Sequence, residues 1–435
     1  MDRPGLLNVA AAVRGAPVVR QTGRLDAVGE GVLRVTGLAR AGRLGERVTV
    51  GVGAVGGEIV GAADGRISVL LDRSPAGLIP GDRVLAEGAA ALAPDPSWIG
   101  RIVDPAGRPL DGRPLLPGAV SLAHFAAAPA AATRRAMGAR LSTGLRAFNT
   151  VLPIVRGQRI GLFAGSGVGK SSLLAAFARG IEADVVVLAL IGERGREMRD
   201  FVERALGPEG MARTVVIAAT ADRPAADRAR CLPAALAVAE RFRDDGRHVL
   251  LLADSITRHA EAHRQMAAAR GEAPVIAGFP ASTAPEIMSL AERAGPGAEG
   301  SGDITAIFTV LVPGSDMEGP LADILRGVLD GHVVLDRAIA ERGRFPAIDL
   351  VRSVSRALPE AATAHEMTLI VEARRLIAAY ERSELMIRAG LYNAGSDRVL
   401  DAAVEAWPKL DAFLGQSEPM DPGESFRALA RCLSR

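Results

Sequence analysis

Hydrophobic positions divide the chain into three stretches with different periodicities. In residues 1–88, apolar and polar residues alternate over short runs, as at Val48, Val50 and Val52, and glycine-rich turns separate the runs. An alternation of period two is typical of strands that bury one face. We therefore predict a small N-terminal all-β unit over residues 1–88, in the form of a β-barrel.

The middle stretch, residues 89–360, changes to strands that alternate with helices. The runs Val185–Ile191, Thr214–Ala219 and Val249–Ala253 are continuously apolar, which is typical of strands buried on both faces of a parallel sheet. The segments between these runs can carry crossover helices. The alternation predicts a central, doubly wound α/β domain built on a parallel sheet.

The last stretch, residues 361–435, has helical patterns only. Glu366–Ala389 is a long amphipathic segment that stops at Gly390, and shorter amphipathic segments follow at Val399–Leu414 and Phe426–Leu433. Glycine is a common residue just after a helix end. We predict a C-terminal helical domain, so the fold class of the whole chain is α/β with a barrel in front and helices behind.

Composition narrows the choice of compartment and partners. The 435 residues are 49% hydrophobic and 23% charged, with a net charge of +2 and no basic tail, so electrostatics give no reason to expect nucleic acid as a ligand. The two cysteines, Cys231 and Cys432, fit neither a disulfide framework nor a zinc cluster. The apolar run Leu6–Val13 is too short for a signal peptide or a membrane span. We expect a soluble cytoplasmic protein.

The strongest chemical signal is a glycine loop between a predicted strand, Arg159–Ala164, and a predicted helix, Ser171–Arg179. Backbone N–H groups can converge on an anion where side chains do not obstruct, and the helix N-terminus adds its positive end. We predict that Lys170 reaches the β- and γ-phosphates of ATP and that the Ser171 hydroxyl, in preference to Ser172, binds Mg²⁺. The alternative, a glycine-rich turn with an incidental lysine, is poor because the chain has only two lysines. The predicted nucleotide-binding residues are Gly165, Ser166, Gly167, Val168, Gly169, Lys170, Ser171 and Ser172.

Two carboxylates follow predicted buried strands. Asp254 ends one of them, where a charge is costly without a partner, and we predict that it helps to hold Mg²⁺; the alternative is a cap for the helix after Ser255. Glu193 follows another strand and is our candidate for orienting and polarising the attacking water. The alternative for Glu193 is that its charged run is an ordinary loop that faces solvent, because such loops have the same local pattern.

Longer stretches of sequence resemble the rotary ATPase α/β superfamily. They include residues 161–171, the loop 192–197 and the segment 346–356, and the similarity extends from about residue 20 to 415. Within the superfamily, the sequence is most similar to the flagellar protein export ATPases, in runs that comprise residues 157–159, 219–224, 331–335 and 388–392. The loop 277–286 departs from the tyrosine- and proline-rich form usual in these proteins.

The resemblance implies a RecA-like P-loop domain between the barrel and the helices, assembled as a homohexamer. It makes Glu193 the catalytic glutamate, with Lys170 beside it, and makes Arg356 an arginine finger that enters a neighbouring subunit's site. A guanidinium supplied in trans stabilises transition-state charge. Arg194 and Arg258 are further candidate cations on the phosphate side.

The function implied by the resemblance is Mg²⁺-dependent ATP hydrolysis that energises type III export of flagellar proteins across the cytoplasmic membrane. The implied partners are a stator-like ATPase regulator, a central-stalk-like coiled-coil protein, the membrane export gate and export chaperone–substrate complexes. The implied location is peripheral, on the cytoplasmic face of the inner membrane at the flagellar basal body. Alternatives are an injectisome type III secretion ATPase, a rotary ATP synthase subunit, a hexameric RNA helicase and a non-catalytic nucleotide-binding scaffold. Glu193 and Lys170 argue against the scaffold, and no aromatic or basic nucleic-acid platform is visible.

Two further groups of charged residues have simpler explanations. His259 and His263 stand four residues apart on a predicted helix, but no third metal ligand is evident, so we expect exposed helix residues. Acidic and basic side chains also alternate along the long C-terminal helix, which predicts a solvated face; they are Glu372, Glu381 and Glu384 with Arg374, Arg375 and Arg382.

Overall fold

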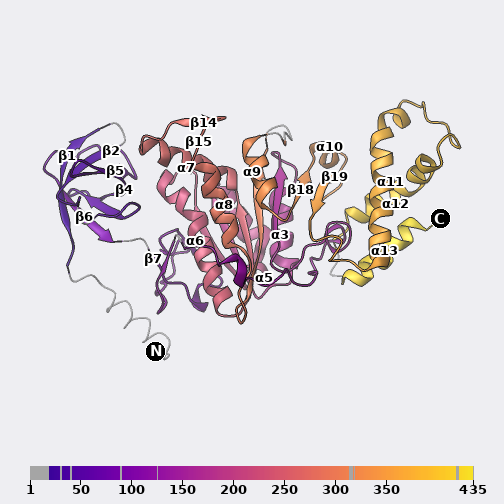
Figure 1. Ribbon diagram of the computed structural model, residues 1–435, viewed down its shortest axis with the longest axis horizontal. Coiled ribbons are helices and arrows are strands. Elements are labelled where there is room, and N and C mark those ends of the chain that lie inside the picture. The colour runs from indigo at the N-terminus through magenta and orange to yellow at the C-terminus, as the bar shows by residue number, and fades with distance from the viewer. Residues whose placement is uncertain are drawn as a thin grey trace.

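The computed structural model describes residues 19–434 apart from 30–31, 40–41, 89–90, 125, 313–316, 318 and 418–420. The chain is elongated, with a barrel at one end, a sheet domain in the middle and a helical domain at the other end (Figure 1). The apolar run Leu6–Val13 lies outside the described residues. Within the described ranges, no helix has both the length and the hydropathy of a membrane span.

Six antiparallel strands close the N-terminal barrel in the order β1-β2-β5-β4-β3-β6. The predicted alternation is confirmed at Val48 and Val50, which are fully buried, whereas Val52 lies in the turn after β3 and is fully exposed. Closure removes the unpaired edges that an open sheet of this size would present. The strands are β1 (Thr22–Val28), β2 (Val32–Thr36), β3 (Arg47–Val50), β4 (Val55–Ala63), β5 (Arg66–Leu71) and β6 (Arg83–Gly88).

The central sheet has nine strands, eight of them in the order β19-β18-β10-β17-β13-β11-β12-β8, with β16 paired to β17. All pairs are parallel except β18 with β19 and β16 with β17. The strands are β8 (Ile102–Val103), β10 (Arg159–Ala164), β11 (Val185–Ile191), β12 (Thr214–Ala219), β13 (His248–Asp254), β16 (Gly295–Pro296), β17 (Asp303–Leu311), β18 (Gly331–Leu335) and β19 (Ile348–Ser355).

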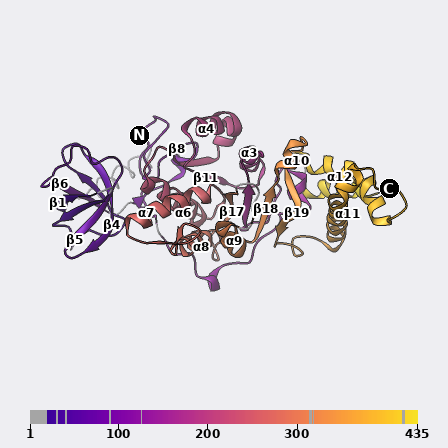
Figure 2. The ribbon, with the colours of Figure 1, turned by 90° about the horizontal axis from the view of Figure 1, so that it is seen from above.

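Helices cover both faces of this sheet (Figures 1 and 2). Leu173, Leu174 and Phe177, which the sequence pattern placed inside, are buried against one face, and the long helix after β12 covers the other. The helices of this domain are α2 (Arg146–Asn149), α3 (Lys170–Gly180), α4 (Gly195–Asp200), α5 (Gly207–Met211), α6 (Ala225–Asp244), α7 (Ile256–Ala269), α8 (Thr283–Arg293), α9 (Pro320–Val328) and α10 (Arg337–Glu341). Small sheets pair β7 (Ala91–Leu92) with β9 (Leu122–Ala123) and β14 (Pro274–Ile276) with β15 (Phe279–Pro280).

A buried ion pair joins the barrel to the central domain. Glu58 of β4 lies 2.7 Å from Arg230 of α6, and both side chains are more than nine-tenths buried. Val60 packs beside this pair against Ala226 and Met266. Removing one member of a buried ion pair costs about 3–5 kcal/mol because the other charge stays uncompensated, so the pair fixes how the barrel sits on α6.

The C-terminal domain consists of α11 (Ala364–Arg388), α12 (Arg398–Leu414) and α13 (Pro422–Leu433). Thr363 and Glu366 form a capping box at the start of α11, and Gly390 follows its end with φ of +71°, the conformation that glycine tolerates best. The predicted α/β class with barrel, RecA-like sheet domain and helical domain is confirmed. Its division at residues 88 and 360 stays a prediction.

The expected solvated face of α11 is wrong at two positions. Arg374 donates to the carbonyl oxygens of Leu350 and Ser353, at 3.0 and 2.7 Å. Glu381 is only partly exposed, and burial, followed by the charge of Asp349, raises its pKa to about 7. Arg374 thus joins the C-terminal domain to the end of the sheet, where α11 packs against β19.

Candidate nucleotide-binding site

The glycine loop connects the C-terminal end of β10 to the first turn of α3. Gly167 and Gly169 have φ of +78° and +85°, which residues with a Cβ rarely adopt. A methyl group built on Gly167 would meet no atom within 4 Å, so the loop surrounds open space at a helix N-terminus. This arrangement suits a phosphate group. The side chain of Val168 is buried in the core, so only its backbone can face a ligand.

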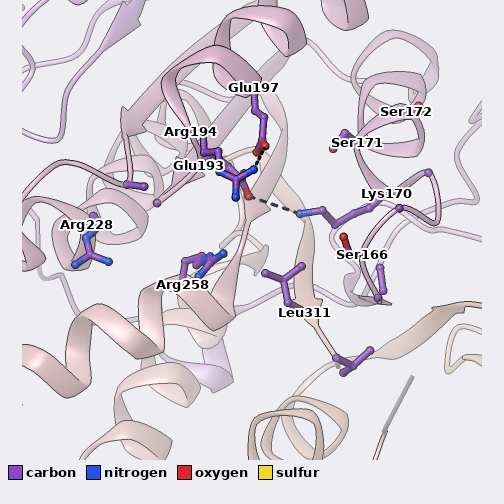
Figure 3. A pocket seen from close by; sticks show the side chains of 17 residues that line it. Ser166, Lys170, Ser171, Ser172, Glu193, Arg194, Glu197, Arg228, Arg258 and Leu311 are labelled. Carbon is purple, nitrogen blue, oxygen red and sulfur yellow. Dashed lines mark hydrogen bonds and ion pairs between the residues drawn. The ribbon is translucent and has the colours of Figure 1, made fainter. Parts of the chain in front are cut away.

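Lys170 lies between the two carboxylates that the sequence singled out. Its Nζ lies 3.9 Å from Oε1 of Glu193 (Figure 3). The same Nζ forms an ion pair with Oδ1 of Asp254. Thr309 of β17 donates to the same Asp254 oxygen at 2.7 Å. The three predicted residues meet because β10, β17, β13 and β11 are neighbours whose carboxyl ends share one edge of the sheet.

Glu193 has a perturbed proton affinity. Burial and then the charge of Asp254 raise its pKa to about 7, and the positive charge of Lys170 opposes this shift. Its side chain is 22% exposed at the edge of the cavity. A carboxyl group poised near neutrality can accept a proton or orient a water molecule in the physiological pH range.

The cavity that contains these residues has a volume of about 850 Å³, enough for a nucleotide. Three arginines line it: Arg194, which pairs with Glu197 at 3.0 Å, Arg258, and Arg228 of α6. The sequence analysis did not identify Arg228, because it lies on a crossover helix outside any phosphate motif. The lining thus has four basic side chains against two acidic ones, Glu193 and Glu197, and an excess of positive charge suits a triphosphate.

The oxygen groups present fit a hard divalent cation. The Ser171 and Ser172 side chains both lie at the start of α3 beside the cavity (Figure 3), and the Asp254 carboxylate lies at the end of β13. Serine hydroxyl and carboxylate oxygens are ligands that Mg²⁺ accepts. Ser171 and Asp254 are therefore the residues that would hold it.

Arg356 lies away from this cavity. It follows β19, is exposed, and donates to the carbonyl oxygen of Arg326 at 2.9 Å. Together with Arg140 and Glu366 it lines a separate cavity of about 870 Å³. The structure thus brings Lys170, Glu193, Asp254 and Arg194 together in one subunit but leaves Arg356 outside.

An aromatic residue that the sequence analysis missed stands beside the glycine loop. Phe345, between α10 and β19, is 51% exposed. A methyl group built on Gly169 would lie 3.1 Å from Cδ1 of Phe345, so the ring borders the loop directly. Phe345 and Gly169 are far apart along the chain. They come together because β18, which precedes the segment of Phe345, pairs with β10, which precedes the glycine loop.

The expectation that His259 and His263 are exposed is wrong. His259 is 1% exposed and His263 is 9% exposed. His263 pairs with the Ser282 hydroxyl at 2.9 Å. Among the described residues, neither ring nitrogen of His259 has a hydrogen-bond partner, although its Nε2 lies 3.9 Å from Oε1 of Glu286. Across the described residues, no group of three or more acidic, histidine or cysteine side chains is placed to hold a metal ion, and His259 and His263 belong to no such group.

We expect His259 to make stability depend on pH. Burial, and then the charge of His263, lower the pKa of His259 to about 3, so the unfolded chain, with an ordinary pKa near 6.5, binds this proton more readily. This contribution is fully present above pH 6.5 and is lost as the pH falls, by about 2 kcal/mol at pH 5. Thermal melts at pH 7.5 and 5 should show a smaller loss for His259→Leu than for the unmodified protein. An equal loss in both would contradict a buried neutral imidazole.

Family models match most of the chain. The nucleotide-binding domain of the ATP synthase alpha/beta family matches residues 144–355, and the T3SS EscN ATPase C-terminal domain matches residues 362–431. A flagellum-specific ATP synthase of Caulobacter vibrioides is 42% identical over 98% of this chain and 99% of its own length. That of Salmonella typhimurium is 42% identical over 97% and 96%, and the SPI-2 type 3 secretion system ATPase of the same organism is 42% identical over 86% of each chain.

Solved structures show the same architecture. The assembled ATPase EscN of the enteropathogenic E. coli type III secretion system superposes with a TM-score of 0.87 at 34% identity, covering 95% of this chain and all of the other. A prototypical ATPase from the type III secretion system of pathogenic bacteria superposes with a TM-score of 0.74 at 38% identity, covering 80% of this chain and all of the other.

Proposed function

The chain belongs to the ATP synthase alpha/beta family, in the branch of the flagellum-specific ATP synthases and type III secretion ATPases, and we propose that its ATP hydrolysis energises the export of flagellar proteins. As a member of this family it is an ATP-hydrolysing enzyme. The observation that carries the proposal is the position of Lys170, which lines the nucleotide cavity with Glu193 and pairs with the buried Asp254 behind it, combined with near full-length similarity to flagellum-specific relatives.

In the proposed site, Lys170 and the loop amides bind the β- and γ-phosphates, and Ser171 and Asp254 hold Mg²⁺. A Mg²⁺ ion held by these two side chains would supply positive charge that offsets the charge of the phosphates. The ion pair of Lys170 with Asp254 keeps the amine directed into the cavity before ATP arrives. Glu193 orients the attacking water and takes up its proton, a task that suits its raised pKa. Arg194, Arg228 and Arg258 add positive charge around the phosphates.

Phe345 is the residue that we propose for the adenine. Its half-exposed ring borders Gly169, at the start of the helix whose N-terminus faces the phosphates. An aromatic ring in this position can stack on a base, which contributes about 1–3 kcal/mol.

The separation of Arg356 from the site supports a ring of subunits. We propose a homohexamer in which Arg356 of one subunit completes the site of the next. EscN has been seen assembled and in complex with its central stalk EscO, and a central-stalk-like coiled-coil partner is part of the proposal for this chain. The remaining proposed partners are a stator-like regulator, the export gate and chaperone–substrate complexes, with the protein held peripherally at the cytoplasmic face of the inner membrane.

Deleting the gene in its own bacterium tests the export role. We expect cells without extracellular filament protein and without swimming, which the unmodified gene restores and a Lys170→Ala gene does not. The SPI-2 relative is as identical to this chain as the flagellar relatives are, which makes injectisome secretion the second candidate function.

Cells that form normal filaments but no longer secrete effector proteins would show an injectisome role in place of the flagellar role. Phosphate release by the purified protein, with and without EDTA, tests the Mg²⁺ requirement separately.

A further inference from the structure

The loop that carries Phe345 is held by the C-terminal domain. Arg344, the preceding residue, is 7% exposed. Its Nε lies 2.9 Å from Oδ1 of Asp411 on α12, and its Nη2 donates to the carbonyl oxygen of Ile348 at 2.8 Å. One side chain thus links α12, the first residue of β19 and the backbone that carries the aromatic ring.

Asp411 is the main counter-charge of this buried guanidinium. Burial lowers the pKa of Arg344, and Asp411 exerts the largest opposing effect. Within the described part of the chain, Nε and Nη1 of Arg344 and Oδ1 of Asp411 are buried without a hydrogen bond of good geometry, so the 2.9 Å contact between Arg344 and Asp411 is an ion pair. Glu381 also faces Arg344, but with a pKa of about 7 it is only partly ionised at neutral pH. Because the buried guanidinium of Arg344 has few other partners, it depends strongly on the negative charge of Asp411.

The end of α12 also touches this loop. A methyl group built on Gly415, just after α12, would lie 3.5 Å from Cγ of Arg344 and 3.5 Å from the carbonyl oxygen of Phe345. The segment therefore rests on α12 through both its backbone and its charge. Any displacement of α12 relative to the sheet must be transmitted to this segment or break the ion pair.

We propose that Arg344 is a positioning residue of the nucleotide site, and that its ion pair with Asp411 lets the position of the C-terminal domain set the place of the Phe345 ring. The inference rests on the proposed contact of Phe345 with adenine. Through this ion pair, the C-terminal domain would control the affinity for ATP and would leave the rate of the chemical step unchanged. A partner that moves α12 would change how tightly each subunit holds ATP.

Steady-state ATP hydrolysis by the full-length protein tests this inference. Asp411→Asn, at a side chain that is 32% exposed, should fold normally and raise KM for ATP about fivefold with kcat within about twofold. Arg344→Lys keeps the charge and should give a smaller rise. The matched control is Arg337→Gln on the preceding helix α10, which breaks a 2.9 Å contact with Glu341 inside that helix and should leave KM unchanged.

A double-mutant cycle separates positioning from general stability. Phe345→Ala alone should raise KM, and adding Asp411→Asn to it should change KM by less than about 1.5-fold, because the ring to be positioned is absent. If Phe345→Ala raises KM but Asp411→Asn does not, or if Asp411→Asn acts equally in both backgrounds, the inference is overturned while the adenine contact stands. If Phe345→Ala leaves KM unchanged, the adenine contact itself is wrong and the inference falls with it.

Discussion

Arg356→Ala should reduce ATP turnover about 1,000-fold or more while leaving ATP binding to the single subunit intact. The expected loss is that of an arginine finger supplied in trans, and binding survives because Arg356 does not line the cavity of Lys170. The matched control is Arg352→Ala in β19, the strand just before Arg356; neither it nor its ion-pair partners, Asp336 and Asp349, line either cavity. Phosphate release gives turnover, and a fluorescent ATP analogue gives binding.

Mixed rings show whether the arginine acts in trans. Arg356→Ala subunits retain Glu193, and Glu193→Gln subunits retain Arg356, so an equal mixture should regain activity at about a quarter of its sites, where the first type lies next to the second in the correct order. Each variant alone should stay inactive. Mass spectrometry confirms that mixed rings have formed. Mixed rings without regained turnover would rule out completion of the site by a neighbour.

Glu193→Gln should lower kcat by about 100- to 10,000-fold, the range typical of losing a positioned general base. The amide keeps the size of the side chain but cannot take up the proton of the attacking water. Affinity for ATP should be kept or increased, because the carboxylate near Lys170 no longer repels the γ-phosphate. Single-turnover phosphate release and equilibrium binding measure the two effects.

Glu197→Gln is the control for that experiment. Glu197 lines the same cavity and is 51% exposed; it pairs with Arg194 at 3.0 Å and also hydrogen-bonds Glu193, whose pKa it helps to raise. We expect less than about a threefold change in kcat, since an exposed ion pair contributes little. Equal losses in the two variants would show that the cavity needs its negative charge and not a specific base at Glu193.

The sequence predicted those parts of the molecule that local patterns determine. The bounds of Arg159–Ala164, Val185–Ile191 and Thr214–Ala219 agree with the strands found, because a strand buried on both faces is a continuous apolar run between breaks. The glycine loop can likewise be predicted from a short stretch of sequence. Asp254 and Glu193 could be placed because parallel strands end at a common edge, although their distances to Lys170 required the strand order.

What the sequence missed depends on contacts between distant segments. Phe345 borders Gly169 because β18 lies beside β10, and no pattern near either residue indicates this. His259 was assigned to solvent because a lone histidine does not show which side of α7 faces the core. Arg374 and Glu381 belong to a charged face that looks solvated until β19 is packed against it.

The isolation of Lys170 also affects how this protein can be labelled. Apart from the α-amino group, a subunit offers amine-reactive reagents two targets, Lys170 and Lys409, and the first is the amine that lies among the acidic groups of the nucleotide cavity. Lys409 is exposed, so amine coupling would label the C-terminal domain there, and any reagent that also reached Lys170 would compete with ATP for it. Thiol chemistry is the better route, since Cys231 is buried and Cys432, on α13, is partly exposed and lies in the helical domain whose movement the probe would need to follow.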